Sequence, residues 1–217
     1  MKNKKMELVF ILDKSGSMSG LESDTIGGFN SLLEKQKDGK GDVSVTTVLF
    51  NDDYQLLHDH VSIHEVSPLT SDNYFVGGTT ALLDAIGKTI HDLINLQKRR
   101  GRKHAANKVM IVIITDGLEN SSREYSYRKI KELISTEQEK YGWEFLFLGA
   151  NIDAAKVAGD VGIRKERATN YHADSKGTSL NYQVLSDAVK SVRENDTIDD
   201  HWNKRIEEDY KNRKGWD

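Results

Sequence analysis

Three oxygen-bearing side chains follow an apolar run near the start of the chain, at alternate positions. Residues 8–12 are all apolar, and Asp13, Ser15 and Ser17 come directly after them in the sequence D-K-S-G-S. One carboxylate and two hydroxyls on alternate residues can converge on one point if the loop curls around it. Hard oxygen donors with little negative charge suit Mg²⁺, which takes octahedral geometry and keeps several waters. The spacing indicates a candidate cation site, although alone it is a weak signal.

The same residues also have an interpretation that needs no ligand. Asp and Ser commonly form side-chain turns and helix caps, and taken alone this reading is favoured. Two later positions shift the balance, because Thr80 follows the pair Gly77-Gly78 and Asp116 follows the apolar run 109–114. In an open α/β sheet, ligands bind in the crevice at the carboxyl ends of the strands, where such residues would gather.

These positions resemble the metal-ion-dependent adhesion site of von Willebrand factor type A domains, in which D-x-S-x-S is followed by a distant Thr and a distant Asp. The resemblance covers roughly the first 150 residues. It implies a divalent cation, Mg²⁺ with Mn²⁺ or Ca²⁺ as alternatives, held by Asp13, Ser15, Ser17, Thr80 and Asp116. The three hydroxyls are expected as direct ligands and the two carboxylates as direct or water-mediated ligands. Thr79 competes with Thr80 for the same role.

The resemblance also implies a function. In the family an acidic side chain of a partner protein completes the metal, so we expect an unidentified protein partner that presents a carboxylate. This is binding without turnover, and no enzyme activity is expected.

Apolar periodicity predicts that strands and helices alternate along the chain. Strands are predicted over residues 8–12, 43–50, 54–60, 109–114, 143–148 and 167–171. Helices are predicted near residues 21–37, 82–103, 130–134, 154–158 and 180–192. The expected fold is a doubly wound α/β protein with a mostly parallel six-stranded sheet of order 3-2-1-4-5-6. Strand 3 is expected antiparallel at the edge, and helices are expected on both faces.

Composition limits the classes of protein to consider. The chain has 217 residues, a formal net charge of −3 and no cysteine. Disulfides and thiolate metal sites are therefore excluded, and a dedicated nucleic-acid binder is disfavoured. No apolar run approaches a membrane span, and the lysines before residue 8 precede a run too short for a signal peptide. We expect a free-standing cytoplasmic protein of bacterial or phage type, with no nucleic acid and no membrane as partner.

The chain is expected to divide unequally. Residues 1–195 are predicted to form the von Willebrand A-type domain, and residues 196–217 a charged C-terminal helix or tail. Because this last segment is heavily charged, with scattered aromatic residues, a frayed or solvated helix is the favoured interpretation.

Other sites and functions stay open from the sequence. His58, His60 and His64 could share a strand face and bind a metal, but exposed edge-strand histidines are the preferred explanation. Asp13 could serve as the nucleophile of a Mg²⁺-dependent phosphohydrolase. That chemistry also needs a cationic group on the phosphoryl oxygens, and the strand alternation points Lys14 away from Asp13. A third alternative is a scaffold domain with a degenerate metal site.

Overall fold

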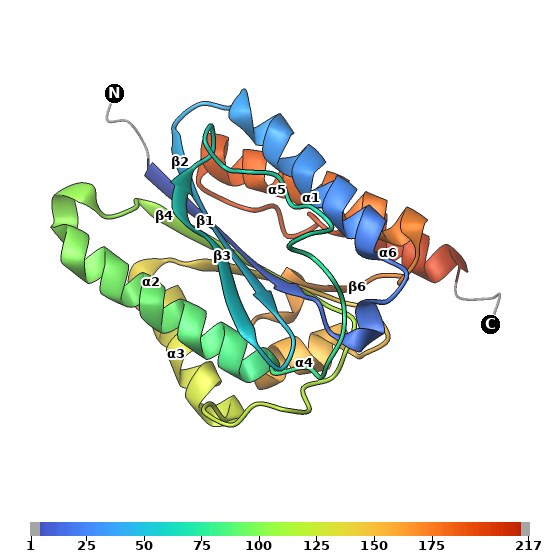
Figure 1. The fold of residues 1–217 in the computed structure, drawn as a ribbon. Coiled ribbons are helices and arrows are strands. Elements are labelled where there is room, and N and C mark those ends of the chain that lie inside the picture. Colours follow the sequence, from blue (N-terminus) through green and yellow to red (C-terminus); the bar gives the residue numbers. More distant parts are fainter. Residues whose placement is uncertain (1–4, 214–217) are drawn as a thin grey trace.

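The computed structural model describes residues 5–213, except for the side chains of residues 102–104. Residues 214–217, the end of the predicted tail, lie outside this range. A six-stranded sheet in the order β3-β2-β1-β4-β5-β6 forms the centre of the molecule (Figure 1). The strands are β1 (Lys5–Asp13), β2 (Asp42–Phe50), β3 (Tyr54–Ser62), β4 (Lys108–Thr115), β5 (Glu144–Gly149) and β6 (Ala168–Asn170). Only the β2-β3 pair is antiparallel, which confirms the predicted fold class and strand order.

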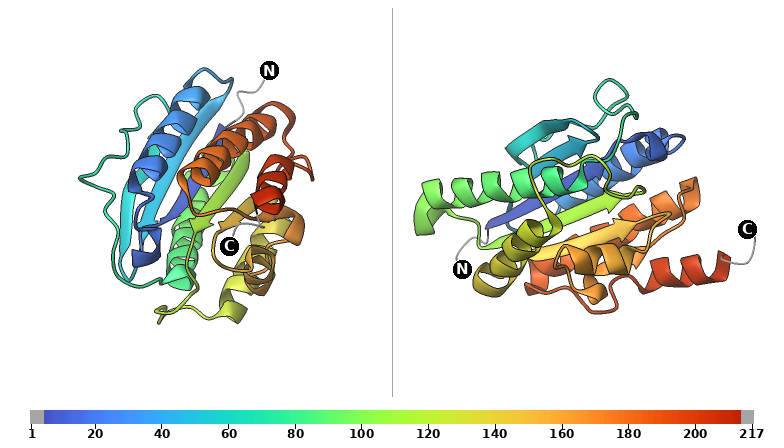
Figure 2. Two further views of the ribbon diagram at one scale, coloured as in Figure 1. Left: turned by 90° about the vertical axis from the view of Figure 1, so that its right-hand side faces the viewer. Right: turned by 90° about the horizontal axis from the view of Figure 1, so that it is seen from below.

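Helices cover both faces of the sheet (Figure 2). They are α1 (Glu22–Lys37), α2 (Leu82–His104), α3 (Tyr127–Tyr141), α4 (Ala154–Asp160), α5 (Ser175–Asn195) and α6 (Lys204–Arg213). Helices α1 and α5 pack on one face and α2, α3 and α4 on the other. Two short 3-10 turns, η1 (Gly16–Met18) and η2 (Lys165–Arg167), lie in the connecting loops.

The central strands are apolar on both faces because both faces are covered. In β1, Phe10 contributes to the core beneath α1 and α5, and Ile11 contributes to the core beneath α2 and α3. Both side chains are 0% exposed. The sheet therefore lies between two apolar cores. The strands β1 and β4 are parallel neighbours in it, so the carboxyl ends of both strands lie at the same edge.

The interpretation of the three histidines as exposed edge-strand residues is wrong for His58. This side chain is buried, and its ring nitrogens lie 3.0 Å from the Thr47 and Ser67 hydroxyls. The β2-β3 register is irregular at this point, and His60 has a φ of 54°. The bulge turns His60 toward Glu7 on the opposite face, so the two histidines do not share a face. Within the described residues, no group of three His, Asp or Glu side chains is placed to hold a metal.

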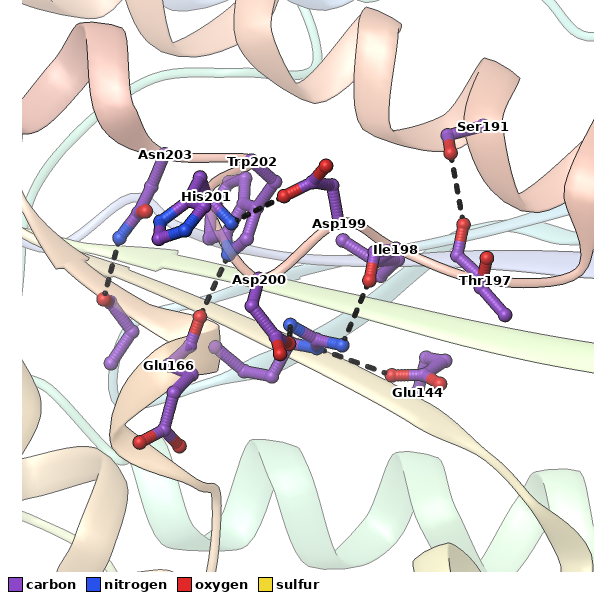
Figure 3. Close-up of polar contacts among 12 residues, drawn as sticks. Glu144, Glu166, Ser191, Thr197, Ile198, Asp199, Asp200, His201, Trp202 and Asn203 are labelled. Atoms are coloured by element: carbon purple, nitrogen blue, oxygen red, sulfur yellow. Dashed lines mark hydrogen bonds and ion pairs between the residues drawn. The ribbon is translucent and has the colours of Figure 1, made fainter.

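The expected frayed or solvated C-terminal helix is instead packed against the domain. Figure 3 shows the segment that leads into α6 held by polar contacts to the β6 edge of the sheet. Trp202 donates its indole N–H to the Glu166 carbonyl at 2.9 Å, and Asn203 donates to the Ala168 carbonyl of β6 at 3.2 Å. Ile206 in α6 is only 2% exposed. The helix was expected, but its packing was not, because most of its residues are charged and few apolar side chains mark the packed face.

The helices also bear on the membrane question. Among the described residues, no helix combines the length and the apolar character that crossing a bilayer requires.

Candidate metal centre

Asp13 ends β1 at the carboxyl edge of the sheet and is fully buried. Its Oδ1 accepts the Ser15 N–H at 2.7 Å, and its Oδ2 accepts the Thr115 hydroxyl at 2.6 Å. Burial raises the pKa of Asp13, and these hydrogen bonds oppose that rise in part. The side-chain turn that the sequence allowed as an alternative to a metal site is therefore present. It fixes the carboxylate at the edge where the other predicted ligands lie.

The loop after β1 curls as the spacing predicted. The turn η1 brings the Ser15 and Ser17 hydroxyls to 3.0 Å from each other. The backbone of the loop is tied to the segment before α2, because the Gly16 N–H donates to the Gly78 carbonyl at 3.1 Å. Two loops far apart in sequence are thereby joined at the carboxyl edge of the sheet.

Thr80 lies at this edge beside the two serines. The space next to Gly117 shows the convergence, since a Cβ built on this glycine would stand 3.0 Å from Thr80 Oγ1 and 3.1 Å from Ser17 Oγ. Any larger residue at position 117 would intrude between the hydroxyls. Thr79 is exposed and its N–H is directed to Asp52, so the geometry favours Thr80 over Thr79.

Asp116 follows β4 and brings a second carboxylate to the same place. It is 3% exposed, and neither of its carboxylate oxygens meets a hydrogen-bond donor in normal geometry. Burial raises the pKa of Asp116; the nearby Ser17 hydroxyl opposes the rise and the charge of Asp13 adds to it. All five predicted residues are therefore brought together.

This group of five residues, which we call the oxygen cluster, has no positive charge of its own. In the described part of the chain, no Lys, Arg or His forms an ion pair with Asp13 or Asp116. The neighbouring Lys14 instead donates its Nζ to Gln55 Oε1 at 2.8 Å. Buried carboxylates normally require a cation or a full set of donors. Two buried acids, one with both oxygens unsatisfied, beside three hydroxyls fit a divalent cation with oxygen ligands.

Sequence reasoning missed the residues that position the two loops carrying Thr80 and Asp116. Asn120 and Thr80 link the two loops by two hydrogen bonds. The Thr80 N–H donates to Asn120 Oδ1 at 2.9 Å, and the Asn120 N–H donates to the Thr80 carbonyl at 3.0 Å. Glu119 accepts the Leu83 N–H at 2.9 Å at the start of α2. Asp84 in the first turn of α2 accepts three successive backbone N–H groups, those of Arg123, Glu124 and Tyr125. An acidic residue in a first helical turn was the one available signal, and it predicts capping rather than a link to a distant loop.

Solved structures of low sequence identity share the fold. A proximal thread matrix protein 1 from the mussel byssus, solved with a zinc-occupied MIDAS motif, is 14% identical with a TM-score of 0.58, over 87% of this chain and 46% of that chain. The ArnB paralog VWA2 from Sulfolobus acidocaldarius is 17% identical with a TM-score of 0.56, over 85% and 45%. The pilus adhesin SpaC from Lactobacillus rhamnosus GG, in its open conformation, is 10% identical with a TM-score of 0.63, over 89% and 31%. The present chain thus spans less than half the length of each of these proteins.

Sequence comparison gives a family assignment. No curated protein sequence matches significantly. The sequence model of the von Willebrand factor type A domain matches residues 7–183, which contain the whole oxygen cluster, β2 to β6 and all of β1 except its first two residues. The chain therefore belongs to the von Willebrand factor type A domain family.

Proposed function

We propose that the protein is a divalent-metal-dependent protein-binding module. In this proposal the hydroxyls of Ser15, Ser17 and Thr80 hold a Mg²⁺ ion directly, and Asp13 and Asp116 hold it directly or through water. The observation that carries the proposal is the pair of unsatisfied, buried Asp116 oxygens beside three convergent hydroxyls, with no cationic side chain to pair with them. Oxygen-only donors favour Mg²⁺, Mn²⁺ or Ca²⁺ over softer metals.

The donor set also explains why a partner would be recruited. Three of the five donors are neutral, so the ion would keep much of its positive charge. A metal in such a site attracts a further anion to an open coordination position. The anion we propose is the carboxylate of an Asp or Glu on a partner protein, and its arrival is binding without a chemical step.

The phosphohydrolase alternative is less compatible with this geometry. A nucleophilic Asp13 needs an accessible carboxylate oxygen, but both of its oxygens accept hydrogen bonds and the side chain is fully buried. The Lys14 ammonium, which could have neutralised a phosphoryl group, is directed to Gln55. Metal-dependent hydrolysis of phosphate esters that is lost in Asp13→Ala would nevertheless overturn the binding proposal.

Thermal unfolding with and without metal tests the proposal first. Saturating Mg²⁺ or Mn²⁺ should raise the melting temperature of the wild-type protein, since a ligand that binds only the folded state stabilises it. Asp13→Ala should remove the increase. An unchanged wild-type melting temperature would instead favour the scaffold with a degenerate metal site.

The second step tests the partner. Affinity capture from cell extract in Mg²⁺, compared with the same extract in chelator, should retain a protein that Asp13→Ala fails to retain. We further propose that this occurs in the cytoplasm, a location consistent with the absence of cysteine. Capture that persists unchanged in chelator would contradict a metal-completed contact.

A further inference from the structure

Two large apolar side chains are exposed on the segments that carry the oxygen cluster. Phe75 is 61% exposed and Leu118 is 60% exposed. Among the described residues, few large apolar side chains are exposed to this degree, and Tyr141 at the far end of α3 is another, at 64%. Scattered single apolar residues on a surface need no explanation. Two of them on segments that are hydrogen-bonded to, or continuous with, one polar site are a different arrangement.

Phe75 is held beside the Asp13 loop by its chain neighbours. The preceding residue, Tyr74, is buried and donates its hydroxyl to the Asp13 carbonyl at 2.7 Å. Two residues later, the Gly77 N–H donates to the Lys14 carbonyl at 2.9 Å. The Lys14 ammonium also lies 5.0 Å from the centre of the Phe75 ring. The ring is therefore fixed next to the oxygen cluster while its other surface is open to solvent.

Leu118 lies on the loop after β4, and its neighbours are anchored. It directly follows Asp116 and Gly117, whose backbone lines the three hydroxyls. The next residue, Glu119, is fixed because its carboxylate accepts the Leu83 N–H at 2.9 Å and the Ser122 N–H at 2.7 Å. The backbone of Leu118 thus lies between two residues that make hydrogen bonds, and its side chain is exposed close to Gly117 in the sequence.

We propose that Phe75 and Leu118 form an apolar rim that selects the partner's sequence, an inference that rests on the proposed metal-dependent binding. The segment recognised would be an acidic residue with apolar residues on both sides of it. Its carboxylate would reach the metal, and its apolar neighbours would cover Phe75 and Leu118. Apolar surface that is removed from water between two chains contributes to affinity roughly in proportion to its area.

The charges around the rim favour a protein segment over a membrane surface. Asp52 is exposed near Gly78, and Glu119 adjoins Leu118. Lys14, whose ammonium lies beside Phe75, is only 5% exposed and donates to Gln55. Membrane-binding surfaces are usually basic, because anionic lipid headgroups attract them. Acidic side chains in these positions would be repelled by such headgroups. A partner carboxylate would escape this repulsion only at the metal, which places the acidic residue at the centre of the segment and the apolar ones outside it.

The test compares two synthetic peptides by NMR titration of the protein in saturating Mg²⁺. One has the sequence Gly-Gly-Phe-Asp-Leu-Gly-Gly, and the other has glycine in place of the Phe and the Leu. We expect the first to bind about tenfold more tightly, because the two apolar contacts together contribute on the order of 1.4 kcal/mol. The double variant Phe75→Ala/Leu118→Ala should lose this preference and keep its Mg²⁺-induced rise in melting temperature. Tyr141→Ala, which removes an equally exposed apolar side chain elsewhere, should change neither.

The outcomes separate the rim from the metal site. Equal affinity for the two peptides, or a preference that survives in Phe75→Ala/Leu118→Ala, overturns the rim even where Mg²⁺ stabilises the protein. Absence of any Mg²⁺ stabilisation overturns the proposed function itself. Self-association, or binding to vesicles of phosphatidylglycerol, that is lost in the double variant would assign the rim to a second copy or a membrane and so overturn the protein segment.

Discussion

The two ends of β1 each bury a carboxylate, and they stabilise it in different ways. Glu7 lies near the start of the strand and Asp13 at its end, and both are 0% exposed. Glu7 accepts the Thr46 hydroxyl at 2.8 Å. Its other oxygen contacts Nδ1 of the His60 imidazole as an ion-pair partner, although these two atoms make no hydrogen bond in normal geometry. Asp13 meets a hydroxyl and a backbone N–H, with the second carboxylate of Asp116 nearby.

The difference between the two ends supports the proposed metal site. Burial of an acid is common to both ends, so burial alone carries no information about a ligand. At the Glu7 end the chain supplies a basic side chain of its own. At the Asp13 end it supplies a second acid and three hydroxyls, an arrangement that is complete only when a cation comes from outside.

Of the changes that test this contrast, neutralising Asp116 should have the largest effect on the free energy of unfolding in Mg²⁺. In chelator, Asp116→Asn should leave the folded state as stable as the wild type or more stable by about 1 kcal/mol, because a buried charge without partners is removed. Wild-type protein at a Mg²⁺ concentration of about 100 times the dissociation constant should gain about 2.7 kcal/mol, and the variant none of it. Urea unfolding with and without Mg²⁺ measures both, and a full Mg²⁺ gain in the variant would contradict the assignment of Asp116.

Removing His60 should act at the other end only. His60→Ala leaves the buried Glu7 oxygen without its partner, and we expect a loss of about 1–3 kcal/mol in the free energy of unfolding. Mg²⁺ should stabilise this variant by the same increment as wild type. The double variant with Glu7→Gln should recover part of the loss, since an amide removes the buried charge. If the loss in His60→Ala disappears on adding Mg²⁺, the two ends are not independent.

The pH dependence of the Mg²⁺ increment should be the smallest of the three effects. Burial raises the folded-state pKa of Asp13 and Asp116 above the unfolded value of 3.8. In the metal-free protein this contribution to stability is fully present below that value and is lost as the pH rises through the raised pKa values. Protons compete with the cation, so the Mg²⁺-induced rise in melting temperature should grow between about pH 4 and about pH 7. Thermal unfolding scans across this range measure it, with Asp116→Asn as the unresponsive control, and a rise independent of pH would contradict binding through these carboxylates.

Local patterns were sufficient to predict much of the fold. The apolar runs predicted all six strands, and the helices between them predicted the parallel direction of all but strand 3. The strand order came from the doubly wound pattern. The oxygen cluster could be predicted chiefly because its residues match the family's D-x-S-x-S, Thr and Asp pattern, and they also lie at strand ends or in a glycine-marked loop. The convergence of Ser17 and Thr80 beside Gly117 confirms that sequence distance becomes proximity at the sheet edge.

What the sequence could not predict depends on contacts between distant segments. A single residue with positive φ, His60, moves His58 and His60 to opposite faces, and no strand pattern signals it. The link between Asp84 and the loop after β4 joins residues about 40 positions apart. Likewise, Trp202 and Ile206 read as isolated apolar residues in a charged tail until η2 and β6 provide their contacts.

Anomalous scattering from crystals soaked in Mn²⁺ tests the central claim most directly, because it locates the cation without reference to stability or partners. The account predicts one strong peak within coordination distance of the Ser15, Ser17 and Thr80 hydroxyls, with Asp13 and Asp116 bound directly or through water, and no peak between Glu7 and His60. A structure with no peak among these five side chains, or with the only peak at the Glu7 end of β1, would contradict it.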